Sequence, residues 1–204
     1  RFWELRLAFG DTPPSGKDVL VLEDLAVGYG RQPLLTDINL TLRQGERVAL
    51  VGPNGGGKTT LLRTLMGELP PLAGGFRLGT GVRAGHYAQE QEGLGAGRNA
   101  LEELSSVVGW GETEARTFLH RFLFTGDDVF VPLERLSYGE RARLALAKLV
   151  AAGCNLLLLD EPINHLDIPS RERFEWGLAQ FGGTVLVVAH DRTFIGRVAT
   201  AVWS

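Results

Sequence analysis

The sequence of 204 residues is poor in cysteine, and Cys154 is the only one. A single cysteine excludes an internal disulfide framework and a zinc site built from cysteine thiolates. It is compatible with a reducing compartment, and we therefore expect a cytoplasmic protein. Long apolar runs are also lacking, because the longest, such as residues 185–189, have about five residues. A membrane-spanning helix needs about 18, so we expect no direct insertion into a membrane.

The sequence has one methionine, Met66, and so no initiating methionine. Its first residues also lack the apolar core of a signal peptide. We therefore expect a piece of a longer protein. A strong excess of one charge is lacking as well, since the formal net charge is −3. Such a balance does not provide the basic surface that binds nucleic acid by bulk electrostatics, although a local patch or a neighbouring segment could do so.

The sequence does contain enough apolar residues to build a core, since hydrophobic residues make up 44% of the chain. Strand-like patterns over residues 19–29 and 38–43 predict a small antiparallel β layer. Short apolar runs over residues 47–51, 156–160 and 184–189 predict buried strands. Because helical patterns lie between these runs, we expect an α/β fold with a mostly parallel core sheet and right-handed crossovers.

Two other stretches add to the expected organisation. Residues 76–89 predict a hairpin around a Gly-Thr-Gly turn. Residues 99–124 have helical spacing that is interrupted at Gly109 and Gly111. We interpret this region, at about residues 92–140, as a small helical subdomain.

A capping-box pattern marks the start of a further helix. Residues 137–140 read Ser-Tyr-Gly-Glu, in which the serine satisfies an early helix amide and the glutamate reaches back to the cap. The helix is expected over residues 138–152 and should stop at Gly153. Another helix is expected over residues 170–180.

The strongest motif directly follows the strand-like run 47–51. Residues 52–59 match the phosphate-loop pattern G-x-x-x-x-G-K-[ST] completely and lie between a predicted strand and a predicted helix. The glycines let backbone amides face a β-phosphate, the Lys58 ammonium would bridge β- and γ-phosphates, and the Thr59 hydroxyl would bind Mg²⁺. The expected nucleotide-binding residues of this loop are Gly52, Pro53, Asn54, Gly55, Gly56, Gly57, Lys58, Thr59 and Thr60.

Two other predicted strands end in residues that can carry chemistry. One ends in the carboxylates of Asp160 and Glu161, and the other is followed by His190. The carboxyl ends of parallel strands form the edge where α/β proteins bind ligands. We expect Asp160 to approach Mg²⁺ through a water, Glu161 to polarise the attacking water as general base, and His190 to hydrogen-bond the γ-phosphate. A histidine at a strand end can also be an ordinary polar group.

These motifs resemble, in order and over nearly the whole chain, those of the ATP-binding cassette (ABC) ATPases. Residues 136–140 are similar to the family signature LSGGE/Q, and residues 164–167 are similar to its D-loop. The resemblance implies that Gln89 is the Q-loop residue and that Tyr29 stacks on adenine, although Tyr29 could be an ordinary strand-end tyrosine. The implied catalytic residues are Glu161, His190, Gln89 and Asp167. The implied Mg²⁺ ligands are Thr59, Gln89 and Asp160. The implied signature residues are Ser137, Tyr138, Gly139 and Glu140.

More detailed sequence features resemble those of the ABC-F proteins, which are soluble ATPases with tandem cassettes that act on ribosomes. Residues 161–167, Glu-Pro-Ile-Asn-His-Leu-Asp, look like the EPTNHLD of ABC-F proteins. Transporter cassettes usually have a serine-alanine or serine-asparagine pair before the final Leu-Asp. The resemblance implies that residues 1–204 are a single ATP-binding domain, the second cassette of its parent, with residues 1–10 as the tail of the preceding linker.

The resemblance also implies a function. In ABC pairs the signature of one cassette closes the nucleotide site of the other, so we expect this chain to bind ATP and Mg²⁺ and to hydrolyse ATP only when paired with a second cassette. The pair would act as an ATP-gated clamp in ribosome-associated translation regulation or antibiotic resistance, with the ribosome bound through segments outside this chain. The alternatives are the ATP-binding subunit of a membrane transporter and a degenerate cassette that is only a nucleotide-gated scaffold.

Two residues depart from the family pattern. Tyr138 replaces the first glycine of the signature, and Ile163 replaces the usual threonine after the Glu-Pro pair. A tyrosine beside Ser137 could crowd the approach of the signature to a γ-phosphate. The composite site that this signature completes is therefore expected to be slower or purely structural, whereas the site built on Lys58 and Glu161 looks intact.

Overall fold

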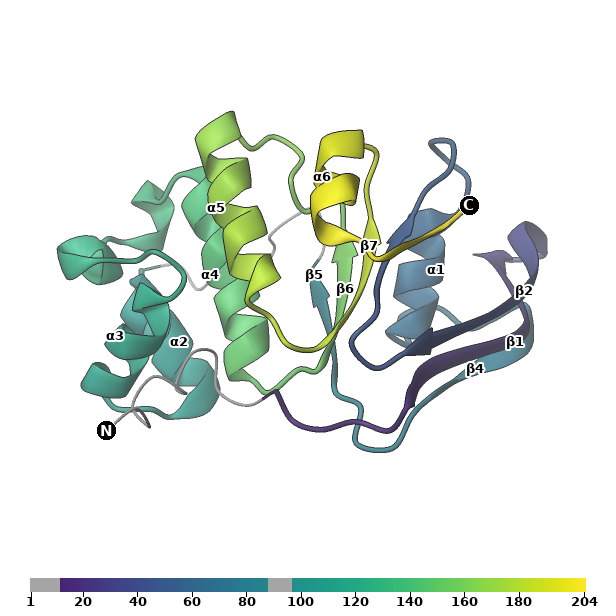
Figure 1. Ribbon diagram of the computed structural model, residues 1–204, viewed down its shortest axis with the longest axis horizontal. Helices are drawn as coiled ribbons and strands as arrows, with labels where there is room; N and C mark the ends of the chain where they lie inside the picture. Colours follow the sequence, from purple (N-terminus) through teal and green to yellow (C-terminus); the bar gives the residue numbers. More distant parts are fainter. Residues whose placement is uncertain (1–11, 88–96) are drawn as a thin grey trace.

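The computed structural model describes residues 12–87 and 97–204. Its centre is a five-stranded parallel sheet with the strand order β5-β6-β7-β3-β8 (Figure 1). The strands are β3 (Arg47–Leu50), β5 (Ala84–Tyr87), β6 (Leu156–Asp160), β7 (Thr184–Val188) and β8 (Ala201–Trp203). The predicted parallel core sheet is thereby confirmed, and β8 is an additional edge strand beside β3 that the sequence pattern did not indicate.

A second sheet is antiparallel and has the strand order β2-β1-β4. Its strands are β1 (Asp18–Tyr29), β2 (Gln32–Arg43) and β4 (Ala73–Leu78). Gly30 lies in the turn between β1 and β2 with a φ of 60°, the left-handed conformation that tight hairpin turns need. The predicted antiparallel β layer is confirmed.

The hairpin predicted over residues 76–89 is wrong. A turn exists, since the Val82 amide donates to the Gly79 carbonyl at 3.2 Å, but the flanking strands belong to different sheets. β4 pairs with β1, and β5 pairs with β6. Gly79 lies so close to β1 that a Cβ there would overlap the Asp18 carbonyl oxygen. The local turn residues indicated the bend, whereas strands distant in sequence determined the pairing.

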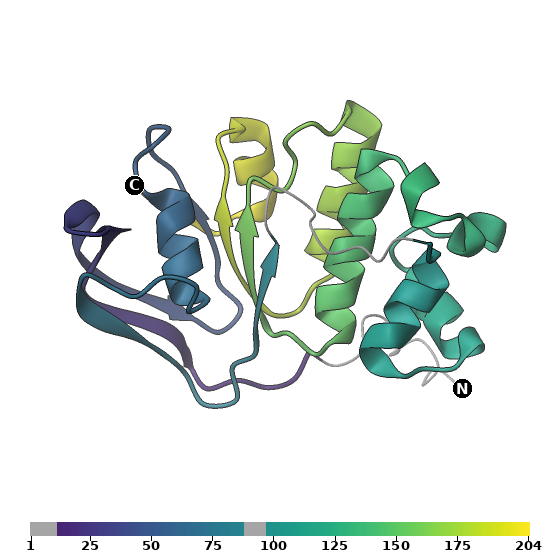
Figure 2. The same ribbon diagram turned by 180° about the vertical axis from the view of Figure 1, so that it is seen from behind.

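Helices cover both faces of the parallel sheet (Figures 1 and 2). Helix α1 (Lys58–Leu65) lies on the side of the antiparallel sheet, while the opposite face is covered by α4 (Tyr138–Ala151), α5 (Ile168–Ala179) and α6 (Arg192–Val198). In β6, Leu156 and Leu158 pack in the core around α1, and Leu157 and Leu159 pack in the core beneath α4 and α5. This alternation is expected of a strand that is buried on both faces.

A small helical region packs beside α4. It consists of α2 (Ala100–Val108), α3 (Glu112–His120) and two short 3-10 helices (Gly126–Phe130 and Leu133–Arg135). The predicted interruption is confirmed, because Gly109 ends α2 in the left-handed conformation with a φ of 68°. Buried Glu103 of α2 forms an ion pair with Lys148 of α4. This pair joins the helical region to the α/β core.

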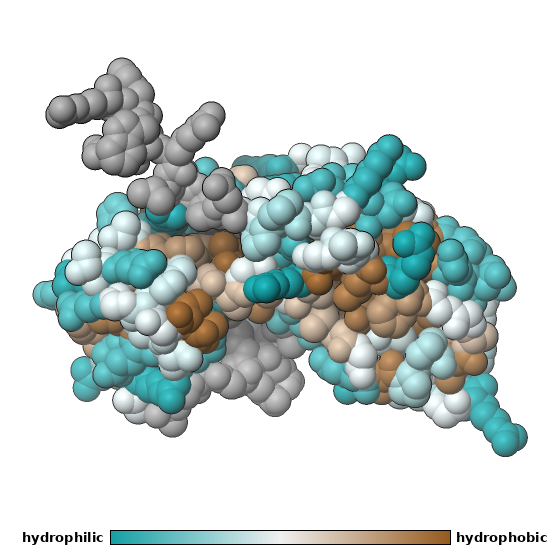
Figure 3. All heavy atoms as spheres, turned by 90° about the horizontal axis from the view of Figure 1, so that it is seen from below, coloured by the Kyte–Doolittle hydropathy of each residue, from teal (hydrophilic) through white to brown (hydrophobic). Residues whose placement is uncertain are grey.

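The surface combines polar areas with separate apolar patches. On the face shown in Figure 3, hydrophobic residues gather in patches between hydrophilic ones. Large apolar side chains that are exposed include Ile168, Val202 and Tyr29, at 73%, 53% and 51%. Within the described residues, no helix has both the length and the apolar character needed to cross a membrane.

Candidate nucleotide site

The phosphate-loop residues connect β3 to α1 through backbone conformations that favour glycine. Gly55 and Gly57 have φ values of 76° and 87°, in the left-handed region. A Cβ at Gly57 would also lie 3.0 Å from side-chain atoms of Leu34 and Leu35. Gly57 is the N-cap of α1, so the loop brings the first amides of this helix to the carboxyl edge of the sheet. A loop of this form can bind an anion.

Lys58 is the first residue of α1, and its side chain folds back over the loop. Its Nζ donates hydrogen bonds to the carbonyl oxygens of Gly52, at 2.9 Å, and Pro53, at 2.7 Å. Only 8% of the residue is exposed. Because the loop already orders this side chain, little conformational entropy remains to be lost when the ammonium contacts a phosphate.

Asp160 ends β6 next to the loop and is 4% exposed. Burial raises the pKa of its carboxyl group, and a hydrogen bond with the Thr59 side chain opposes this rise. The Oδ1 atom is buried without a hydrogen-bond partner among the described residues. An unpartnered carboxylate oxygen beside a threonine hydroxyl fits Mg²⁺, which commonly binds few protein ligands together with waters and phosphate oxygens.

Glu161 is held from two sides. Its Oε1 lies 3.3 Å from His190 Nε2, and its Oε2 accepts a hydrogen bond from Asn164 Nδ2. Its φ of 46° is uncommon for a residue with a Cβ. Its backbone amide donates to the Val188 carbonyl at the end of β7, at 3.0 Å. The turn after β6 thereby places the Glu161 carboxylate beside His190, the second residue after β7.

The phosphate loop, Lys58 and Glu161 meet in one pocket of about 480 Å³, and Asp160 is not among the residues that line it. Its lining residues are Tyr29, Leu34, Asn54, Gly55, Gly57, Lys58, Thr59, Thr60, Glu161, Asn164 and His190. The end of β1, the phosphate loop and the ends of β6 and β7 therefore surround one space. Leu34 and Asn164 were not predicted as binding residues. Asn164 could have been found from the D-loop pattern, whereas no sequence signal distinguishes Leu34.

Some predicted site residues lie elsewhere. Gln89 and the proposed linker tail, residues 1–10, are outside the described residues. Asp167 does not line the pocket, because it caps α5 and accepts a hydrogen bond from the Ser170 amide at 2.9 Å. Hydrogen bonds from the Ser170 hydroxyl and amide lower the pKa of this carboxyl. The loop residues that do not line the pocket are Gly52, Pro53 and Gly56.

The signature residues begin α4, outside the lining of this pocket. Ser137 and Glu140 form the predicted capping box. The Glu140 amide donates to Ser137 Oγ at 3.3 Å, and the Ser137 amide donates to Glu140 Oε2 at 2.8 Å. The helix continues to Ala151, and Gly153 follows with a φ of 77°, close to the predicted stop.

Two neighbours of the signature serine contact the start of α5 and the loop before it. The Tyr138 ring meets His165 edge-on, with ring centroids 6.1 Å apart and an interplanar angle of 84°. A Cβ at Gly139 would overlap the Ser170 side chain, so glycine allows α4 and α5 to begin close together. The signature and the D-loop are therefore in direct contact within this chain.

Comparison with known proteins gives a consistent family. Residues 35–164 match the protein family described as ABC transporter. The chain is 50% identical over 196 residues to the putative ATP-binding protein YdiF of Bacillus subtilis. This alignment covers 95% of this chain and 30% of YdiF. The chain is 36% identical over 200 residues to the ATP-binding protein Uup of Haemophilus influenzae (96% of this chain, 31% of Uup). It is also 36% identical over 202 residues to ABC transporter F family member 2 of Arabidopsis thaliana (98% and 30%).

The chain thus spans about 30% of the length of these relatives. Among solved structures, the ATP-binding cassette MJ0796, a dimer in a post-hydrolysis state bound to ADP and Pi, has a TM-score of 0.73 at 23% identity, over 88% of this chain and 91% of that one. A bacterial Atm1-family ABC exporter with ATP bound has a TM-score of 0.78 at 20% identity, over 96% of this chain and 39% of that one. These two likenesses establish the fold. The family match and the relatives lead to the conclusion that the chain belongs to the ABC transporter family and is an ATP-binding cassette of the ABC-F type.

Proposed function

We propose that the chain binds ATP with Mg²⁺ and hydrolyses it when a second cassette completes the site. The observation that carries this proposal is the pocket, where the phosphate loop, Glu161 and His190 come together from distant parts of the sequence. The fold shared with MJ0796 bound to ADP and Pi supports nucleotide hydrolysis as the chemistry.

Each part of the pocket has a role in this proposal. The half-exposed ring of Tyr29 stacks on the base, and Lys58 contacts the β- and γ-phosphates. Thr59 and Asp160 would hold Mg²⁺, which neutralises charge on the phosphate oxygens. Glu161 accepts a hydrogen bond from the attacking water, and its contacts with neighbouring side chains fix the direction of the carboxylate.

The proposed hydrolysis requires a facing cassette. The signature residues line no part of the described pocket in their own chain, which supports their use in the site of a partner. In-line attack depends on positioning and charge stabilisation that one half-site does not complete. ATP would close the pair and hydrolysis would reopen it, which makes the pair a timed clamp. Gln89 and Asp167 keep their proposed roles in the Q-loop and D-loop.

For the whole protein we propose a cytoplasmic ABC-F factor in translation or antibiotic resistance that binds the ribosome through segments outside this chain. This chain would be its second cassette, with residues 1–10 as the end of the linker. Support comes from the D-loop residues 164–167 and from the F-family relative in Arabidopsis. The alternative is the ATP-binding subunit of a membrane transporter, which the description of the matched family favours.

Sedimentation of the full-length parent protein with ribosomes separates these two functions. The parent carries Glu161→Gln and the equivalent change in its other cassette, so that bound ATP persists. Co-migration with ribosomes that requires ATP would support the translation role. No co-migration despite verified ATP binding would reject that role and direct a detergent pull-down at a membrane partner. The same protein with Lys58→Ala is the control, because it should co-migrate no more than the protein without ATP.

A further inference from the structure

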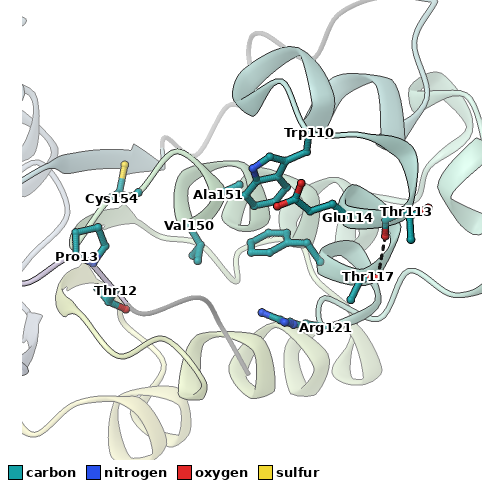
Figure 4. Close-up of a pocket in the computed structure, with 12 residues that line it drawn as sticks. Thr12, Pro13, Trp110, Thr113, Glu114, Thr117, Arg121, Val150, Ala151 and Cys154 are labelled. Atoms are coloured by element: carbon teal, nitrogen blue, oxygen red, sulfur yellow. Dashed lines mark hydrogen bonds between the residues drawn. The ribbon is translucent and has the colours of Figure 1, made fainter. Parts of the chain in front are cut away.

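A second cavity lies between α3 and the end of α4, away from the nucleotide pocket. Its volume is about 580 Å³, within the range of about 300–1,000 Å³ that is usual for small-molecule sites. The described lining residues of the two pockets have none in common. Figure 4 shows Trp110, Glu114 and Arg121 on one side of the cavity and Pro13 and Cys154 on the other. The cavity is therefore a separate candidate site.

The walls of this cavity are largely apolar. On the side of α3, the rings of Trp110 and Phe118 meet nearly edge-on, with centroids 5.0 Å apart. Phe118 belongs to the buried core, and Trp110 packs against that core. The end of α4 contributes Val150, and Cys154 follows it. Burial raises the pKa of the Cys154 thiol, which keeps it uncharged at neutral pH. Such walls fit an aromatic ring between them.

One cationic group lies against this apolar surface. The Arg121 guanidinium lies over the Phe118 ring, 5.9 Å from its centroid. Among the described residues it forms no ion pair, although Glu114 also lines the cavity. Burial lowers the pKa of Arg121, and no described carboxylate offsets this loss of hydration. A partly buried cation without a counterion favours an anionic ligand.

The acidic residue in the lining lies away from Arg121. Glu114 is in the first turn of α3, and Arg121 is the C-cap of the same helix. At about 1.5 Å per residue, the two positions are about 10 Å apart along the helix. Glu114 is also exposed, so solvent and salt screen its charge. An anionic group beside Arg121 would therefore experience mainly the attraction of the guanidinium.

We propose that this cavity binds a planar aromatic molecule that carries one anionic group. The rings would lie between the aromatic wall at Trp110 and Phe118 and the end of α4, and the anionic group would pair with Arg121. An uncharged molecule with the same rings would keep the apolar contacts and lose the ion pair. Because the two walls belong to the helical region and the α/β core, a bound molecule would also hold these parts together. The proposal is independent of the nucleotide chemistry proposed above.

Two fluorescent probes test the proposal in the full 204-residue chain. Anilinonaphthalene sulfonate has the proposed chemistry, whereas phenylnaphthylamine has the same rings without the negative charge. Arg121→Gln should weaken binding of the sulfonate by about tenfold, because a charge-assisted contact is lost. The same change should leave binding of the uncharged probe as it is. Arg116→Gln is the matched control, since it removes the same charge from α3 at a position that does not line the cavity. It should change neither affinity.

The native thiol reports where the sulfonate binds. Cys154 lines the cavity and is the only cysteine in the sequence. When nine-tenths of the chains hold the sulfonate, alkylation of Cys154 by iodoacetamide should be about tenfold slower. ATP should not displace the probe, because the two pockets share no described lining residue. Loss of the probe on addition of ATP, or alkylation at the same rate with and without the probe, would overturn the proposal.

The affinities of the two probes decide the role of Arg121. If Arg121→Gln weakens both probes equally, or neither, the guanidinium does not select an anion and the proposal is wrong. Circular dichroism verifies that the variant is folded. If it does not fold, Thr117→Trp serves instead, because Thr117 is exposed and lines the cavity. A tryptophan there should fill the cavity and abolish binding of both probes, and unchanged binding would overturn the proposal.

Discussion

At the scale of single residues, the nucleotide site contains a carboxylate in a position that is unfavourable without a ligand. Asp160 is buried, and its Oδ1 lacks a hydrogen-bond partner among the described residues. Burial disfavours the ionised form and so raises the pKa of Asp160. A carboxyl whose pKa is higher in the folded state contributes stability at low pH, and this contribution is lost as the pH rises through the folded pKa. At neutral pH the ionised group therefore destabilises the nucleotide-free protein.

Asp160→Asn should accordingly raise the melting temperature of the nucleotide-free chain at pH 7. The expected gain is about 1 kcal/mol, or roughly 2–4 °C for a chain of this size. The difference between variant and wild type should shrink as the pH falls and Asp160 is protonated. Differential scanning fluorimetry over a pH series measures both effects. A difference that stays constant with pH would contradict the titration argument.

Lys58→Ala should reduce the affinity for ATP by about 10- to 100-fold, because charge-assisted contacts with the phosphates are lost. Titration with a fluorescent ATP analogue measures the change. Lys17→Ala removes an exposed lysine just before β1 and should leave the affinity as it is. Unchanged binding in Lys58→Ala would show that the phosphate-loop assignment is wrong.

At the scale of elements, α1 follows strand β3 and begins at the pocket, whereas the starts of α4 and α5 lie outside the pocket lining. Helices α4, α5 and α6 each begin with a side-chain cap, provided by Ser137, Asp167 and Asp191. Helix α1 begins at the phosphate loop. Helix N-termini carry partial positive charge. The N-terminus of α1, which has no side-chain cap and lies in the pocket lining, therefore favours an anionic ligand.

Tyr138→Gly should raise the ATP turnover of the full-length paired protein, because it removes the ring beside the signature serine. A rise of up to about tenfold corresponds to about 1.4 kcal/mol in the activation free energy. Tyr138→Ala is the matched variant, since it removes the same ring and the contact with His165 while keeping better helix propensity at the start of α4. Steady-state phosphate release measures turnover. If neither variant is faster, the crowding argument is wrong.

Asp191→Asn should make the fold less sensitive to acid. A hydrogen bond from the Phe194 amide, followed by one from the Thr193 amide and then by the Arg171 side chain, lowers the pKa of Asp191 against the opposing effect of burial. A lowered pKa contributes stability above the unfolded value, about 3.9, which is lost as the pH falls through the folded value. Asparagine caps a helix equally well but does not titrate. The melting temperature should therefore fall less steeply between about pH 4 and pH 2 in the variant than in the wild type. If the melting temperatures of both proteins fall equally steeply with pH, Asp191 does not have this role.

At the scale of the whole molecule, the sequence was most informative where one stretch of chain contains a complete motif. The phosphate loop, the two carboxylates at the end of β6 and the capping box at Ser137 could be predicted, because each depends on residues within a few positions of one another. The hairpin prediction failed because β4 and β5 find their partners in β1 and β6. β8 has three residues, too few for a pattern, and the cavity beside Trp110 is formed by residues from distant parts of the chain.

Glu161→Gln should preserve ATP binding and stop hydrolysis in the paired protein. Loss of the proposed general base should slow hydrolysis by at least about 100-fold, while the glutamine side-chain amide can still contact Asn164. Trapped ATP should then hold two cassettes together, which analytical ultracentrifugation would detect as an ATP-dependent dimer of the isolated chain. Asp24→Asn, at an exposed position in β1, is the control. Hydrolysis that continues in Glu161→Gln would assign the base to another residue.

Tyr29, which we propose to stack on the adenine base, and the phosphate loop are attached to different sheets. Tyr29 is the last residue of antiparallel β1, whereas Lys58 follows parallel β3. A nucleotide in the pocket would therefore be a removable cross-link between the two sheets. Their backbone amides should exchange hydrogen as one cooperative unit while ATP is bound and as two separate units after it leaves. ATP would then determine which parts of this domain unfold together.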